Sequence, residues 1–239
     1  MHPLDWKLLH SEYVLHDRWL ALRADTCQLP NGRTMVPYSV LEYPPWVNVV
    51  ALTADQQVVL VRQYRHGVRQ TLLELPSGAV DAADASPLAA APRELLEETG
   101  YGAGAVVETG RLSPNPAPHT HLTYCCLATE VRWVAEPHPE ETEPLETVLL
   151  PLAEVVRLGS TGGLLQALPV GALLFALQAL GKLSWRGRPG LCDAPGHSRG
   201  APRRTPSARV RPLTWACRRR LPASARPSLP LAAAPDAWR

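Results

Sequence analysis

Three glutamates within five residues are the strongest chemical feature of this 239-residue sequence. Glu94, Glu97 and Glu98 lie between Arg93, which directly precedes Glu94, and Gly100. In a helix, residues three and four apart are neighbours, so the three carboxylates share an arc of about 100°. Like charges at this spacing repel, and a hard divalent cation such as Mg²⁺ relieves the repulsion by taking carboxylate oxygens as ligands. The segment predicts a metal site on a helix, although a solvated Glu-rich face gives the same pattern.

The residues before this helix add a second feature. The apolar run from Leu73 to Asp81 breaks at Pro76 and Gly78. A glycine-bearing loop that feeds a helix lets the backbone approach a phosphate closely. We therefore expect Gly78 to lie in a loop next to the acidic helix.

Taken together, the two segments resemble the Nudix box. In that motif a glycine is followed by a glutamate and then by Arg-Glu-apolar-x-Glu-Glu-x-Gly-apolar. The stretch from Arg93 to Tyr101 matches at every defined position, and Gly78 matches the opening glycine. Asp84 stands where the family has glutamate, one extra residue separates it from Arg93, and Pro92 directly precedes the arginine.

The resemblance extends over about residues 5–182 and is closest to the ADP-ribose pyrophosphatase branch of the family. It is carried by Trp46–Leu52, Val58–Arg65, Glu74–Pro76 and Ser113–Pro116. In this superfamily, a proline sixteen residues after the box glycine, here Pro116, indicates nucleoside-diphosphate sugars such as ADP-ribose.

The expected fold class is α+β, a Nudix-like α/β/α sandwich of mixed β-sheet with flanking helices. Residues 1–45 should form N-terminal antiparallel strands for dimerisation and substrate contact, residues 46–183 the catalytic domain, and residues 184–239 a disordered tail rich in Arg and Pro. Asn31-Gly32 predicts a hairpin turn, and a second hairpin is expected around Ala54-Asp55.

The sequence leaves the start of the acidic helix open. If Ser86 is the N-cap and Pro87 the first helical residue, Pro92 lies inside the helix and kinks it. Otherwise the regular helix begins at Pro92. Further strands are expected at residues 72–75, 106–112, 122–134 and 147–151, and helices at residues 152–158 and from Pro169 to about residue 180.

The distribution of charge and the cysteines bear on the partners and the cellular location of the protein. Residues 1–184 carry 12 basic and 20 acidic side chains, whereas residues 185–239 carry 12 arginines and 2 aspartates. The basic tail could touch phosphate, but an appendage without a nucleic-acid partner is the favoured interpretation. The five cysteines have no paired spacing and the first twenty residues have no apolar core of a signal peptide, which together suggest a reducing, cytoplasmic location. The uncharged stretch 158–181 is interpreted as buried helix rather than as a membrane span.

The resemblance also implies roles for individual residues. Glu94, Glu97 and Glu98 would hold Mg²⁺, or Mn²⁺ in its place, with Glu97 and Glu98 part of the catalytic machinery. The general base would come from a distant acidic loop, where Glu143 is the first choice and Glu141 the second.

Other residues are candidates for binding substrate or supporting the site. Arg65 would clamp phosphate, and Glu74 would orient Arg93 or a water on the metal. Trp46 and Tyr38 could stack on adenine, although core packing is the commoner role of such residues. His119 and His121 could contact the terminal ribose, although an ordinary position in a partly exposed loop is the favoured interpretation. Gly78 and Pro116 complete the substrate-binding set, and Arg93 and Asp84 the supporting set.

The function implied is magnesium-dependent hydrolysis of the pyrophosphate bond of a nucleoside diphosphate linked to another moiety. ADP-ribose, giving AMP and ribose 5-phosphate, is the preferred substrate, and the protein is expected to be a homodimer. Two alternatives remain open at this point. One is a Nudix-like module that senses a nucleotide without turning it over, and the other is a hydrolase of dinucleoside polyphosphates or NADH.

Overall fold

The structure is a computed structural model that describes residues 2–17, 20–102, 104–139 and 142–183. The prediction of a disordered tail at residues 184–239 lies outside the described residues. Within the described part, residues up to 183 belong to one compact unit.

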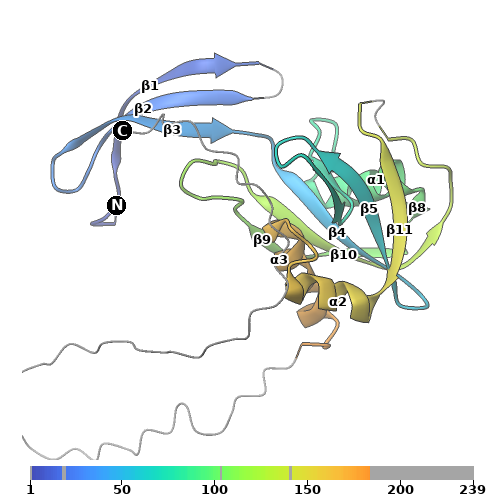
Figure 1. Ribbon diagram of the computed structural model, residues 1–239. Coiled ribbons are helices and arrows are strands. Elements are labelled where there is room, and N and C mark those ends of the chain that lie inside the picture. The colour runs from blue at the N-terminus through green and yellow to red at the C-terminus, as the bar shows by residue number, and fades with distance from the viewer. Residues whose placement is uncertain (1, 18–19, 103, 140–141, 184–239) are drawn as a thin grey trace, which may run out of the picture. The chain divides into compact units, whose positions relative to one another are not determined.

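The N-terminal strands form a sheet of their own (Figure 1). β1 (Lys7–His16), β2 (Ala21–Gln28) and β3 (Thr34–Glu42) are antiparallel in the order β1-β2-β3. The turn between β2 and β3 falls at the predicted Asn31-Gly32, where Gly32 has a φ of 81° that glycine adopts without steric cost. β1 lies at one edge of this sheet, and every one of its residues is exposed.

The second sheet has eight strands. Its main order is β11 (Leu145–Pro151), β5 (Gln57–Arg65), β4 (Trp46–Thr53), β10 (Thr123–Trp133) and β8 (Tyr101–Gly102). β6 (Gln70–Glu74) pairs with β5, β7 (Ser77–Ala79) with β4, and β9 (Ala105–Leu112) with β10. β4 and β10 are parallel and the other pairs are antiparallel, so the sheet is mixed as expected.

Alternating side chains of the central strands fill two separate core layers. Val47 and Val49 of β4 belong to a layer that includes residues of α1 (Pro87–Thr99), while Val50 and Leu52 belong to a layer with residues of α2 (Leu152–Thr161) and α3 (Ala167–Ala179). The two-residue period of a strand places neighbours on opposite faces, and the adjacent Cys125 and Cys126 are accordingly split between the layers. The α/β/α sandwich is confirmed (Figure 1).

Two local expectations were wrong. Gly78 lies in the short strand β7 rather than in a loop, because backbone pairing with Val47 of β4 extends the sheet past Pro76. The strand expected at residues 147–151 begins earlier, at Leu145, since Glu146 pairs with Arg62 in the ladder between β11 and β5. The uncharged stretch 158–181 forms the end of α2 and all of α3, and no described helix is long and apolar enough to cross a membrane.

Candidate functional site

Helix α1 carries the glutamates and is held at both ends. The Ser86 hydroxyl accepts a hydrogen bond from the Ala89 amide at 3.2 Å, which caps the N-terminus. Gly100 ends the helix in a left-handed conformation with a φ of 74°, and its amide donates to the Leu96 carbonyl. The helix begins at Pro87 with Pro92 inside it, which decides between the two starts that the sequence allowed.

The three carboxylates of α1 differ in burial. Glu98 is 8% exposed, the Glu94 side chain 13% and the Glu97 side chain 46%. Glu98 accepts a hydrogen bond from the Ser77 amide at 3.0 Å and forms no ion pair within the described residues. Burial raises the pKa of Glu98 to about 8 and that of Glu94 to about 7. Of these two acids, only the partly buried Glu94 has an ion-pair partner among the described residues, Arg93, and the buried Glu98 has none.

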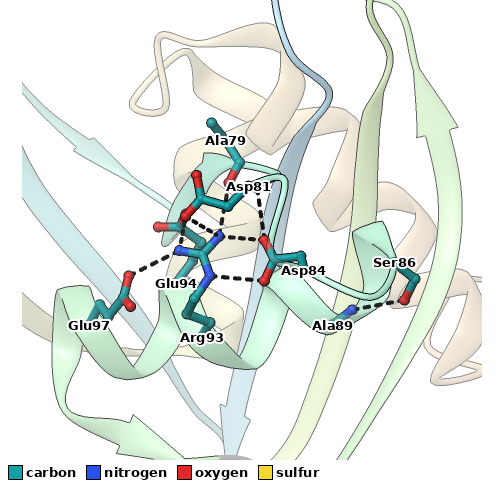
Figure 2. A network of polar contacts seen from close by, with 8 residues as sticks. All are labelled: Ala79, Asp81, Asp84, Ser86, Ala89, Arg93, Glu94 and Glu97. Carbon is teal, nitrogen blue, oxygen red and sulfur yellow. Dashed lines mark hydrogen bonds and ion pairs between the residues drawn. The ribbon is translucent and has the colours of Figure 1, made fainter.

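Arg93 lies at the centre of the polar contacts around the start of α1 (Figure 2). Its guanidinium donates to the Asp84 carboxylate at 2.7 and 3.0 Å and to the Ala79 carbonyl at 3.0 Å. The same guanidinium also donates to the Glu94 carboxylate at 2.9 Å and to the Glu97 carboxylate at 3.0 Å. Hydrogen bonding from Arg93 holds the pKa of Asp84 below its usual range. Asp84 thus contacts the arginine from both oxygens, despite its shorter side chain and the extra residue between them.

Gly78 is required where it stands because of the Glu94 carboxylate. A Cβ atom on Gly78 would lie 2.1 Å from the Glu94 carboxyl carbon and 2.2 and 2.3 Å from its two oxygens. With a side chain at this position, the Glu94 carboxylate would have to move from where it stands. The box glycine and the box glutamate are therefore coupled by packing.

Arg65 pairs with a deeply buried partner. Its guanidinium donates to Glu74, with the shortest contact, Nη2 to Oε2, at 2.7 Å, and Glu74 is 1% exposed. Hydrogen bonding to Glu74 raises the pKa of Arg65. The expectation that Glu74 orients Arg93 was wrong, because the Glu74 carboxylate accepts from Arg65 instead. That Glu74 orients a water on the metal stays a prediction.

These groups surround a cavity of about 620 Å³. Arg93 and the three glutamates line it from α1, together with the predicted residues Trp46, Arg65, Gly78 and Glu143. Sequence reasoning missed further lining residues, among them Tyr43, Gln63, Ser77, Asp81 and His138. Ser77 acts through its backbone amide, for which no sequence signal exists.

Several predicted residues lie away from this cavity. Pro116 is exposed in a turn and lines neither this cavity nor the neighbouring one that His119 and His121 line. The Tyr38 hydroxyl donates to the Ala117 carbonyl at 2.8 Å, and its ring packs against Trp6. Glu141 lies outside the described residues.

The donor set of α1 fits a hard divalent cation in chemical type. Carboxylate oxygens are the ligands that Mg²⁺ prefers, and a cation would supply the positive charge that the buried Glu98 lacks. In the described part of the chain, no three His, Cys, Asp or Glu side chains are already gathered to hold an ion. Arg93 instead holds Glu94 and Glu97.

The mixed sheet between helices, and the glutamates of α1 that line the cavity, agree with the resemblance to the Nudix family. Comparison with known proteins agrees. Residues 42–167 match the NUDIX domain, and residues 6–41 match the nucleoside diphosphate sugar hydrolase N-terminal domain.

Individual relatives point the same way. The chain is 30% identical to an ADP-ribose pyrophosphatase of Mycobacterium tuberculosis over 171 residues, which is 71% of this chain and 82% of the relative. It is 26% identical to an ADP-ribose pyrophosphatase of Bacillus subtilis over 159 residues, 66% of this chain and 85% of the relative. A crystal structure of an ADP compounds hydrolase superposes with a TM-score of 0.65 at 27% identity, covering 74% of this chain and 97% of that one. The chain therefore belongs to the Nudix family, as a pyrophosphohydrolase similar to ADP-ribose pyrophosphatases.

Proposed function

We propose that the protein hydrolyses the diphosphate of a nucleoside-diphosphate sugar, with ADP-ribose as the preferred substrate. Water adds across the phosphoanhydride, so ADP-ribose gives AMP and ribose 5-phosphate. The observation that carries the proposal is the pair of carboxylates from one helix, Glu98 buried and Glu94 partly buried, in a cavity that Arg65 and Arg93 also line. This arrangement suits a polyanion that arrives together with cations.

Glu94 and Glu98 are the proposed ligands of Mg²⁺, with Mn²⁺ as an alternative and Glu97 as the third ligand. When bound, the metal supplies a Lewis acid that neutralises phosphoryl oxygens and makes water more acidic. The hydrogen bond from the Ser77 amide fixes one oxygen of Glu98 and leaves the other for the ion. Glu97, the most exposed of the three, must turn from Arg93 to join them.

Arg65 is the proposed phosphate clamp. Glu74 holds the guanidinium in place, so binding a phosphate costs less side-chain entropy than it would for a free arginine. Planar guanidinium groups bind phosphate oxygens through paired hydrogen bonds. Trp46, which also lines the cavity, is placed to contact the nucleotide.

Glu143 is the proposed general base. It is exposed, it lines the cavity, and its charge acts on both Arg65 and Glu98. A base must come within about 3 Å of the proton that it removes, and a loop can bring it there when substrate binds. Glu141 is the alternative from the same loop.

A substrate panel tests this function. Purified protein with Mg²⁺ is incubated with ADP-ribose, a dinucleoside polyphosphate and NADH, and the products are separated by chromatography. We expect AMP and ribose 5-phosphate from ADP-ribose at the highest kcat/KM. Binding of ADP-ribose without any AMP would contradict the proposal, and a higher kcat/KM for another compound would replace the substrate.

The N-terminal sheet supports the proposal that the protein is a homodimer. β1 exposes Leu8, Leu9, Tyr13, Val14 and Leu15, an unusually apolar edge strand for a free surface. Covering these side chains with a second copy would remove them from water. Sedimentation should give a dimer for the full chain, and a monomer at all concentrations would contradict this. The three described cysteines are free thiols, which suits the proposed cytoplasmic location.

A further inference from the structure

A second cavity of about 350 Å³ adjoins the first. The two share Tyr43, Trp46, Arg65 and Ser77, so they open onto the same aromatic and basic side chains. Whatever binds across the first cavity can extend into the second without leaving these residues.

Four buried polar atoms of this second cavity have no partner. They are the only buried side-chain nitrogen or oxygen atoms without a hydrogen bond in the described part of the chain, and all four belong to residues that line this one cavity. They are Asn48 Oδ1, His119 Nδ1, His121 Nδ1 and Thr123 Oγ1. Buried polar groups are nearly always paired in folded proteins, and Asn48 and Thr123 are only 3% and 0% exposed. Four such atoms around one hollow indicate a missing binding partner.

The chemistry of the partner follows from the lining. Arg65 is its only charged side chain among the described residues, and it sits where the two cavities join. The rings of Tyr43, His119 and His121 pack at centroid distances of 5.3 to 5.6 Å. Burial lowers the pKa of His121, and His119 lowers it further, so His121 is neutral near pH 7. A second phosphate or other anion would find no counter-charge deep in this cavity.

An apolar group is equally unsuited, because it would leave all four polar atoms unpaired. The partner must offer donors as well as acceptors, since Asn48 Oδ1 only accepts, whereas the hydroxyl and the imidazoles act in either sense. Sugar hydroxyl groups have both capacities, and the neighbouring aromatic rings suit the carbon face of a sugar.

We propose that the second cavity binds the sugar ring beyond the diphosphate, and that Asn48, His119, His121 and Thr123 select an uncharged, hydroxyl-rich group there. This rests on the proposed function, since the first cavity must hold the diphosphate. The residues act on recognition and not on the reacting phosphorus, so their loss should appear in KM.

The substitution Thr123→Val tests the proposal because it exchanges a buried, unpaired hydroxyl for a methyl group of the same shape. Replacing an unsatisfied buried hydroxyl should not lower the melting temperature. With ADP-ribose, KM should rise about tenfold while kcat changes little, as for the loss of one hydrogen bond made equally in ground and transition states. His121→Phe, which keeps a flat ring but removes the nitrogens, should act in the same direction. Thr129→Val, further along β10 and outside both cavities, is the matched control.

The same variants are assayed with the methyl ester of ADP, in which a methyl group replaces the sugar. We expect wild-type protein to bind this ester more weakly than ADP-ribose, and Thr123→Val and His121→Phe to leave its KM unchanged. An equal rise in KM for both compounds would overturn the proposal, because the cavity would then hold the nucleoside half. No rise for either compound would also overturn it.

A binding measurement separates this inference from the proposed function. Calorimetry with the α,β-methylene analogue of ADP-ribose gives a Kd that needs no turnover. If wild-type protein hydrolyses neither compound, the proposed function fails. A roughly tenfold weaker Kd in Thr123→Val would then still support the sugar cavity, and an unchanged Kd would overturn it.

Discussion

The two adjoining cavities differ in how their polar groups are satisfied. In the first, charged side chains already bond one another, with Arg93 tied to Asp84, Glu94 and Glu97 and Arg65 tied to Glu74. In the second, the polar groups other than Arg65 are uncharged, and four of their atoms have no partner among the described residues. An unpaired charge in a protein interior costs more free energy than an unpaired neutral polar group. The difference suggests a division of labour between phosphate chemistry and sugar recognition.

The largest effect should come from Glu98→Gln. The amide keeps an acceptor for the Ser77 amide but removes the buried charge proposed to hold the metal. We expect kcat to fall by about 10³-fold or more. Because burial raises the pKa of Glu98 to about 8, the metal-free variant should unfold at the same temperature as wild type or higher. Activity within about threefold of wild type would show that Glu98 is not part of the reaction. Glu154→Gln on α2 serves as the control and should keep full activity.

The next effect should come from Gly78→Ala, which tests whether the fit between β7 and α1 matters. The added methyl group would meet the Glu94 carboxylate at distances that real atoms do not occupy, so one of them must move. A shift of about 1 Å at a catalytic group can cost about 10²-fold in rate. We expect that loss in kcat/KM for ADP-ribose, measured alongside circular dichroism to confirm the fold. Gly67→Ala, where nothing lies within 4 Å of the added atom, should behave as wild type.

Asp84→Asn should give a smaller effect, seen mainly in stability. Arg93 holds the pKa of Asp84 below its usual range, so the ion pair stabilises the native state above the pKa of an unfolded aspartate, about 4. That contribution is lost as the pH falls through the lower native pKa. The variant should lose about 1–2 kcal/mol of unfolding free energy at pH 7, measured by urea denaturation. The difference from wild type should shrink as the pH falls below about 4, and a difference that stays constant with pH would show that the charge is not responsible.

Much of the fold could be predicted because it depends on local pattern. The near-continuous apolar runs of β4 and β5 are typical of strands buried on both faces, and Ser86, Pro87 and Gly100 mark the ends of α1. The second cavity shows the limit. Asn48 and Thr123 look like ordinary strand residues in the sequence, and only the parallel pairing of β4 with β10 brings them to one hollow.

In the candidate site, too, some residues could be predicted from the sequence and others could not. The three glutamates could be found because their spacing alone puts them on one helix face. The partner of Glu74 could not, because it depends on which strand lies beside β6. The effect of the extra residue before Arg93 was equally hidden, since the guanidinium reaches Asp84 only through the turns that precede α1.

The central claim is that buried acids of α1 hold a divalent cation against a diphosphate. Calorimetric titration of Mg²⁺ into metal-free protein with the α,β-methylene analogue of ADP-ribose measures this without turnover. Wild-type protein should bind the ion, and the double substitution of Glu94 and Glu98 by glutamine should abolish that binding while the fold stays intact. An unchanged affinity for Mg²⁺ in the double variant would contradict the account.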